Sequence, residues 1–90
     1  MDTCKVTSED ILKRLKKVEG QVKGIQKMVQ QQQYCGDILI QIAAARAALN
    51  KAGGIILENH SKACIYKALK SEDAEKEVSK LMNTMLKFIK

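Results

Sequence analysis

The sequence contains no proline and no tryptophan, and its 90 residues include only five glycines, two tyrosines and one phenylalanine. Proline and glycine most often end helices and form tight turns, so their scarcity favours long helices over short strands joined by turns. The chain also has a single histidine, no glycine-rich phosphate loop and no pair of carboxylates arranged for acid–base chemistry. We therefore do not expect an enzyme.

Long apolar runs are also missing, and the N-terminus lacks the basic segment and apolar core of an export signal. Three cysteines, an odd number, in a chain without an export signal indicate thiols that are kept reduced. We expect a cytoplasmic protein with no membrane partner. The formal net charge of +6 is compatible with nucleic acid, with an anionic membrane surface or merely with solubility.

The first amphipathic stretch predicts a helix over about residues 8–31, with Thr7 or Ser8 as its cap. Its apolar residues repeat at alternating steps of four and three, which is the pattern of a helix seam. These residues are Ile11, Leu15, Val18, Val22, Ile25 and Val29. Between residues 13 and 27 the chain has six basic residues and only Glu19 against them. Such a lysine-rich face is more often plain solvated surface than a nucleic-acid site, so alone it does not predict DNA binding.

A second seam runs from Ile38 to Ala63 and passes through Gly53 and Gly54 without a change of register. Each glycine costs a helix roughly 1 kcal/mol relative to alanine, but the unbroken register favours one helix over about residues 36–69. That helix would be ~50 Å long, a length typical of a helix that packs against another chain. A shorter helix is expected over about residues 72–89. The predicted fold class is all-α, with a three-helix protomer in a single domain over residues 1–90.

The residues with the clearest chemical potential are Cys35, His60 and Cys64. His60 and Cys64 lie four residues apart, which places them on one face of a helix, one turn from each other. An imidazole beside a thiolate makes two ligands of a soft or borderline metal site, and Cys35 is the obvious third. On one straight helix Cys35 would lie ~37 Å from His60. The three can meet when two copies of the helix run antiparallel, which predicts a two-fold oligomer with metal sites shared between subunits.

Two thiolates and one imidazole suit the trigonal coordination of Cu(I). A structural zinc ion would want a fourth ligand, which Cys4 could supply, so zinc stays open. Taken alone, each cysteine or histidine is more often an ordinary structural residue than a ligand, and only the set of three favours a metal site. Tyr34, next to Cys35, is a candidate hydrogen-bond donor to the ligands. Asn59, the polar interruption of the second seam, is either a register device or a further donor.

Three stretches follow one known pattern, together with His60 and Cys64. They are Arg14-Leu15-Lys16-Lys17-Val18-Glu19-Gly20-Gln21-Val22-Lys23-Gly24-Ile25, Tyr34-Cys35-Gly36-Asp37-Ile38-Leu39 and Gln41-Ile42-Ala43-Ala44-Ala45-Arg46. In these residues the chain resembles the copper-sensitive operon repressor (CsoR) family over essentially its whole length. The resemblance implies an antiparallel dimer built as a four-helix bundle, and a flat tetramer that binds operator DNA when its sensing site is empty. It also implies a site made by Cys35 of one subunit with His60 and Cys64 of its neighbour.

Members of this family differ in what they sense, and the ligand set indicates the type. Nickel and cobalt sensors resemble this chain at Cys35 and His60 but have a histidine where it has Cys64, and persulfide sensors have a cysteine where it has His60. With Cys35, His60 and Cys64 at these positions, the chain resembles the copper-sensing members of the family. A gapless match places Lys80 where copper sensors usually have an acidic residue, with Glu77 the nearest acid. We therefore expect the link between metal binding and DNA release to be rearranged or weaker.

The expected function is that of a Cu(I)-responsive repressor of copper-resistance genes. Its expected partners are operator DNA, further copies of the chain and a copper chaperone as metal donor. By family similarity and by charge, the DNA contacts are expected from Arg14, Lys17, Gln21 and Arg46. Other functions stay open: a persulfide or oxidant sensor in which Cys35 and Cys64 form a reactive pair, a Zn(II)-responsive member of the family, and a metal buffer that does not bind DNA.

Overall fold

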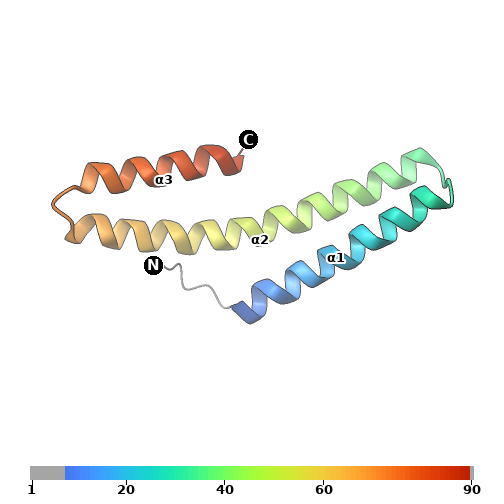
Figure 1. The fold of residues 1–90 in the computed structure, drawn as a ribbon, viewed down its shortest axis with the longest axis horizontal. Coiled ribbons are helices and arrows are strands. Elements are labelled where there is room, and N and C mark those ends of the chain that lie inside the picture. The colour runs from blue at the N-terminus through green and yellow to red at the C-terminus, as the bar shows by residue number, and fades with distance from the viewer. Residues whose placement is uncertain (1–7, 90) are drawn as a thin grey trace. The chain divides into compact units, whose positions relative to one another are not determined.

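The structure, a computed structural model, describes residues 8–89 and contains three helices (Figure 1). They are α1 (Ser8–Gln30), α2 (Cys35–Lys70) and α3 (Ala74–Ile89). No strand occurs among these residues, so the predicted all-α fold with a long central helix is confirmed. The predicted ranges 8–31, 36–69 and 72–89 differ from the observed helices by at most two residues at any end. The suggested zinc ligand Cys4 lies outside the described residues.

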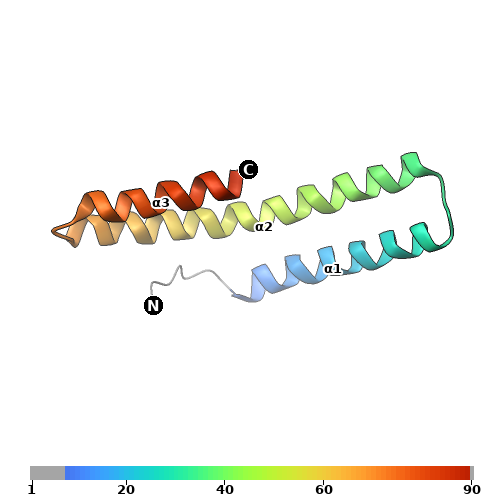
Figure 2. The same cartoon turned by 45° about the horizontal axis from the view of Figure 1, so that its top comes forward.

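The helices form two compact units, which share α2 between them. In one unit, α1 lies along α2 as far as Ala52, and in the other, α3 lies along α2 from Gly53 onward (Figures 1 and 2). No helix within residues 8–89 has an apolar stretch long enough to cross a membrane.

The first unit is held by small residues of α2 against branched residues of α1. Ile11 and Val18 are 7% and 8% exposed, and Ala45 and Ala52 are 8% and 1% exposed. Alanine at the contact lets two helix axes approach closely, and burial of branched side chains there supplies the hydrophobic stabilisation. The core of this unit is therefore one narrow line of contact.

Much of each predicted seam stays open to solvent in the single chain. Its open members are spaced seven residues apart on each helix, which is the spacing of a seam that packs against another helix. They are Leu15, Val22 and Val29 on α1 and Ile42, Leu49 and Ile56 on α2. These side chains are between 36% and 56% exposed. The protomer thus keeps apolar positions at coiled-coil spacing for a partner.

The connection between α1 and α2 closes the first helix with a left-handed residue. Gln32 has a φ of 52°, and its N–H donates to the carbonyl of Val29 at 3.0 Å. The N–H of Gln33 donates to the carbonyl of Met28, also at 3.0 Å. This pair of hydrogen bonds is the Schellman arrangement, which satisfies the last carbonyls of a helix. The chain then enters α2, whose first hydrogen bonds are accepted by the carbonyl of Tyr34.

The connection between α2 and α3 contains a cap formed by short polar side chains. Asp73 accepts a hydrogen bond from the N–H of Lys76 at 3.3 Å through its carboxylate, and the N–H of Asp73 donates to the hydroxyl of Ser71 at 2.9 Å. Acidic residues in the first turn of α3 also interact favourably with the helix dipole. From this cap α3 runs back along α2 and buries Leu81, which is 9% exposed.

Candidate metal centre

His60 and Cys64 lie together on α2, one helical turn apart. The distance between Nε2 of His60 and Sγ of Cys64 is 3.5 Å, and both residues are half-buried. This proximity follows from the helix itself, since residues four apart stand one above the other. Two of the three predicted ligands are therefore brought together by local structure alone.

The spacing of these two atoms fits two ligands of one metal ion. Bonds of ~2.3 Å to sulfur and ~2.0 Å to nitrogen, meeting at an angle between tetrahedral and trigonal, place the donor atoms about 3.5–3.7 Å apart. The observed 3.5 Å lies within this range. A thiolate beside an imidazole is a donor set for Cu(I) or Zn(II) and a poor one for hard cations such as Mg²⁺.

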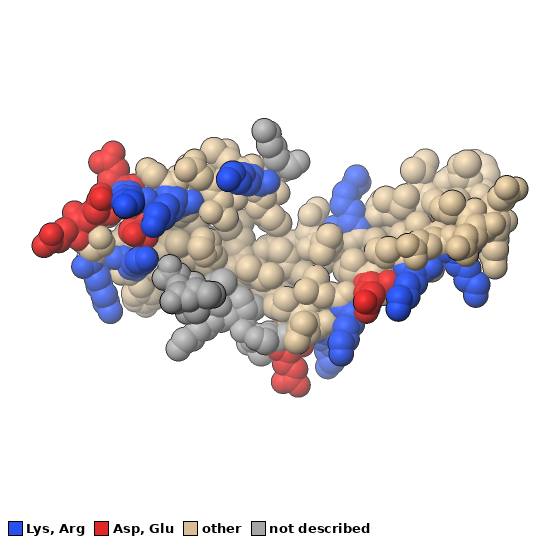
Figure 3. All heavy atoms as spheres, in the orientation of Figure 1, with Lys and Arg blue, Asp and Glu red and all other residues tan. Residues whose placement is uncertain are grey.

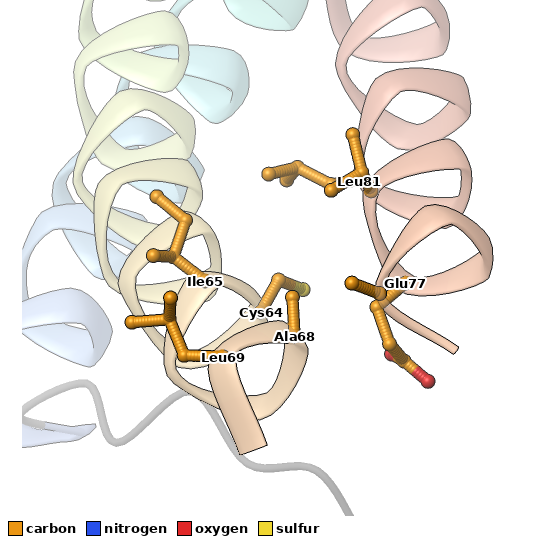
Figure 4. A pocket seen from close by; sticks show the side chains of 8 residues that line it. Cys64, Ile65, Ala68, Leu69, Glu77 and Leu81 are labelled. Carbon is orange, nitrogen blue, oxygen red and sulfur yellow. The ribbon is translucent and has the colours of Figure 1, made fainter. Parts of the chain in front are cut away.

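The sulfur of Cys64 faces α3 across an apolar cavity of about 260 Å³. Figure 4 shows the thiol pointing from α2 toward the side chains of Glu77 and Leu81 on α3. The cavity is lined by Cys64, Ile65, Ala68 and Leu69 of α2 and by Ala74, Glu77, Val78 and Leu81 of α3. Cys64, a predicted ligand, therefore lies where α2 packs against α3, so that a displacement of its thiol would alter the packing of both helices.

Glu77 is the acid that α3 places beside this cavity. Its side chain is only 12% exposed, and its carboxylate lies 3.8 Å from Nζ of Lys67 and 4.0 Å from Nζ of Lys80. Lys80, which stands where the resemblance leads us to expect an acid, is 59% exposed and turned to Glu77. Sequence reasoning named Glu77 only as the nearest acid. Its position one turn before the buried Leu81 is the signal that it faces α2.

Cys35 is the first residue of α2 and is exposed. Within residues 8–89 no three histidine, cysteine, aspartate or glutamate side chains are close enough to hold one metal ion. The single chain thus presents one part of the predicted ligand set at His60 and Cys64, and Cys35 separately. A second chain is needed if the three are to meet.

The two predicted hydrogen-bond donors lie near the two parts of the ligand set. Tyr34 is 74% exposed, and its ring lies where a side chain at Gly36 would otherwise be. Asn59 donates its side-chain amide to the carbonyl of Ile55 at 2.9 Å, within its own helix. The roles of both side chains toward the metal stay predictions.

The basic face of α1 is exposed along the length of the helix. In Figure 3 the basic side chains of α1 gather on the edge turned away from α2, with few acidic side chains among them. The exposed lysines of this face are Lys13, Lys16, Lys17, Lys23 and Lys27.

Among the four predicted DNA contacts, Lys17 and Arg46 are exposed. Arg14 is 39% exposed and its Nε lies 3.3 Å from the carboxylate of Asp10. Gln21 is half-buried, and its side-chain carbonyl oxygen is buried with no hydrogen-bond partner among the described residues. Burying an oxygen without a hydrogen-bond partner is unfavourable. Gln21 therefore differs from the three cations, because the oxygen of its side chain is turned away from solvent.

The fold and the His60–Cys64 pair define a class of protein, an all-helical protomer with an imidazole and a thiol placed as two ligands of a soft metal ion would be. A model of the metal-sensitive transcriptional repressor family matches residues 7–87, and the chain belongs to this family. Among curated relatives, the copper-sensing transcriptional repressor CsoR of Bacillus subtilis (strain 168) is 45% identical over 82 residues, which cover 91% of this chain and 81% of that protein. The copper-sensing transcriptional repressor RicR of Mycobacterium tuberculosis (strain ATCC 25618 / H37Rv) is 39% identical over 61 residues, covering 68% and 64%.

Two solved structures share the fold. The copper-sensing repressor CsoR with Cu(I) from Geobacillus thermodenitrificans NG80-2 matches with a TM-score of 0.81 and 46% identity, covering 91% of this chain and 85% of that one. The nickel-responsive transcriptional regulator InrS matches with a TM-score of 0.82 and 32% identity, covering 92% and 93%. The predicted resemblance to the copper-sensitive operon repressor family is therefore confirmed.

Proposed function

We propose that this protein is a Cu(I)-responsive transcriptional repressor. In this proposal the metal-free oligomer binds operator DNA and represses copper-resistance genes, and Cu(I) binding releases it. The observation that carries the proposal is the pair His60 and Cys64, whose donor atoms are 3.5 Å apart in a chain 45% identical to a copper-sensing repressor. A histidine in place of Cys64 would favour nickel or cobalt, and here the position is a thiol.

The third ligand in this proposal is Cys35 of a second subunit. Support comes from the exposure of Cys35 at the first residue of α2 and from the open heptad positions on α1 and α2. Two antiparallel copies would cover those positions and would create two equivalent metal sites at once. Pairs of such dimers would then form the tetramer, and a copper chaperone would deliver the metal.

The DNA surface in this proposal is the basic face of α1. Arg14, Lys17 and Arg46 would contact phosphates, so affinity would fall steeply with salt concentration. Gln21, whose carbonyl oxygen is buried, would act through the position of α1 unless it turns outward on binding. The usual coupling between two ligands of one protein, ~1–3 kcal/mol, would be enough to empty an operator when the metal site is filled.

Bound copper would join two thiolates and an imidazole from two subunits at a common point. The residues of the chain would position these ligands. His60 and Cys64 are held in register by α2, while Glu77, Lys67 and Leu81 hold α3 against the same turn of that helix. A movement of Cys64 toward a partner's Cys35 would therefore be transmitted to the contact between α2 and α3.

An anaerobic titration of the reduced protein with Cu(I) tests this proposal, with X-ray absorption to identify the ligands and binding to DNA from upstream of its own gene followed in parallel. One copper per protomer bound by two sulfurs and one nitrogen, with DNA released at that stoichiometry, is the expected result. Copper binding that leaves DNA affinity unchanged would refute it. The variant His60→Ala separates the thiol-sensor alternative, because a response to persulfide or oxidant through Cys35 and Cys64 would survive it.

A further inference from the structure

His60 lies in a second small cavity, separate from the one that Cys64 faces. This cavity has a volume of about 180 Å³ and is formed between the middle of α2 and the end of α3. Its walls are Gly53, Ile56, Leu57 and His60 from α2 and Thr84 and Phe88 from α3. The half-buried His60 thus shares this cavity with the apolar Ile56 and Leu57 of its own helix and with Thr84 and Phe88 of α3.

Phe88 reaches the backbone of α2 at Gly53. A side-chain carbon placed on Gly53 would lie 2.5 Å from Cε1 and 2.8 Å from Cζ of the Phe88 ring, so the ring occupies space that any other residue at position 53 would need. The neighbouring Gly54 has nothing within 4 Å of the same position. Of these two glycines, only Gly53 allows the Phe88 ring to pack against the backbone of α2, and this packing offsets the lower helix propensity of glycine.

We propose that Phe88 is a positioning residue for the His60 ligand. Seated against Gly53, the ring forms the wall that confines the imidazole and keeps Nε2 turned toward Cys64. This inference rests on the proposed function of His60 and Cys64 as a Cu(I) site. A ligand that is already confined loses less side-chain entropy when the metal binds, and residues that orient metal ligands commonly contribute 10–100-fold to affinity.

The two glycines provide a matched pair of variants. Gly53→Ala and Gly54→Ala both add one methyl group to the middle of α2 and both raise its helix propensity. Only Gly53→Ala collides with Phe88. Because the collision is with the far end of a side chain, we expect the ring to move away from Gly53 while the helix stays intact.

The first readout requires neither copper nor DNA. Since His60 is the only histidine in the chain, its imidazole nitrogens give one set of signals in long-range ¹H–¹⁵N spectra of the reduced, metal-free protein. We expect these signals to shift or broaden in Phe88→Ala and in Gly53→Ala and to stay as in the wild type in Gly54→Ala. A ring that only packs α3 would leave them unchanged.

The second readout is Cu(I) affinity, measured by competition with a chelator. Phe88→Ala and Gly53→Ala are each expected to weaken it by about tenfold, whereas Gly54→Ala stays within about twofold and Phe88→Leu recovers most of the loss. Combining Gly53→Ala with Phe88→Ala should weaken affinity no further than Phe88→Ala alone, because the ring is the object of the collision.

Wild-type imidazole signals together with wild-type Cu(I) affinity in Phe88→Ala would overturn the inference. Equal effects of Gly53→Ala and Gly54→Ala would also overturn it. If Phe88→Ala unfolds α3, as circular dichroism would show, the comparison of the two glycine variants still decides the question. A wild-type protein that does not release DNA on binding Cu(I) would refute the proposed function instead, and the metal-free spectra would still report on Phe88.

Discussion

At its first residue α2 carries one exposed thiol, Cys35, whereas further along it carries His60 and Cys64 at 3.5 Å from each other and against α3. The pair needs no partner to form, because helical geometry sets its spacing. Within residues 8–89, Cys35 does not belong to any group of three histidine, cysteine, aspartate or glutamate side chains that could hold one metal ion. The contrast teaches that helix geometry brings two of the three predicted ligands together within one protomer, whereas the predicted third ligand could join them only from a second chain.

The largest expected effect is a loss of Cu(I) affinity when one predicted ligand is removed from either part of the predicted ligand set. Cys35→Ala and His60→Ala should each weaken Cu(I) binding by more than about 100-fold, because loss of a ligand exceeds the 10–100-fold effect of losing a residue that merely orients one. Neither variant alone should keep a complete site. Chelator competition on each purified variant gives the measurement.

Mixing the two variants then tests whether the site is shared. When equal amounts are refolded together, random pairing should restore about a quarter of the wild-type sites, since half of the dimers are mixed and each of these has one intact site of two. No recovery after mixing would mean that the ligands do not come from different subunits. A mixture of His60→Ala with Cys64→Ala is the control, because both changes fall on the same part of the site and no intact site can form.

A smaller effect is expected from the cores of the two units. Leu81→Ala and Ile11→Ala remove side chains that are 9% and 7% exposed, and each should lower the free energy of unfolding by ~3 kcal/mol. Only Leu81 lines the cavity that Cys64 faces. Denaturant unfolding and Cu(I) affinity measured on both variants should therefore show similar losses of stability but a weakened metal site for Leu81→Ala alone. Equal loss of copper affinity in Ile11→Ala would show that global stability, not local packing, sets affinity.

The basic face gives a still smaller effect, which is visible mainly in the salt dependence. Arg14→Ala should lower the slope of log affinity for DNA against log salt concentration by about 0.9 for each phosphate that the variant no longer neutralises, without changing copper stoichiometry. Lys62→Ala is the matched control. Like Arg14, Lys62 pairs with an acid four residues away, since its Nζ lies 3.5 Å from the carboxylate of Glu58. Unlike Arg14, it lies on α2 beside the predicted metal ligands. An equal change of slope in Lys62→Ala would place the DNA surface elsewhere.

The helices and the proximity of His60 to Cys64 could be predicted from the sequence because both depend on short-range spacing. Apolar steps of three and four predict a helix and its seam, and a step of four predicts that His60 and Cys64 share a face. The register through Gly53 and Gly54 likewise predicted an unbroken α2, although two adjacent glycines would ordinarily suggest a break.

The surroundings of the ligands could not be read in this way, because they depend on how α3 is placed along α2. Glu77 beside Lys67 and Phe88 against Gly53 are contacts between α2 and α3, and no periodicity within one helix specifies them. Spacing also could not show that the carbonyl oxygen of Gln21 is buried, since family similarity grouped this residue with the cations expected to contact DNA. Sequence patterns thus predicted that His60 and Cys64 lie together, but not which side chains of α3 lie around them.

The smallest effect concerns the connection that leads into Cys35. Gln32 adopts a φ of 52°, a left-handed conformation that is unfavourable for any residue with a side-chain carbon and natural for glycine at the end of a helix. Gln32→Gly should therefore raise the free energy of unfolding by ~0.5 kcal/mol, the relief of strain being partly offset by the greater freedom of glycine in the unfolded chain. Gln30→Gly, inside the last turn of α1, should instead lower it by up to ~1 kcal/mol. Because the connection lies outside the unit that contains His60 and Cys64, neither variant should change the imidazole signals of the metal-free protein. A shift of those signals in Gln32→Gly would mean that the part of the site near Cys35 and the His60–Cys64 pair are linked within one chain, before any partner is bound.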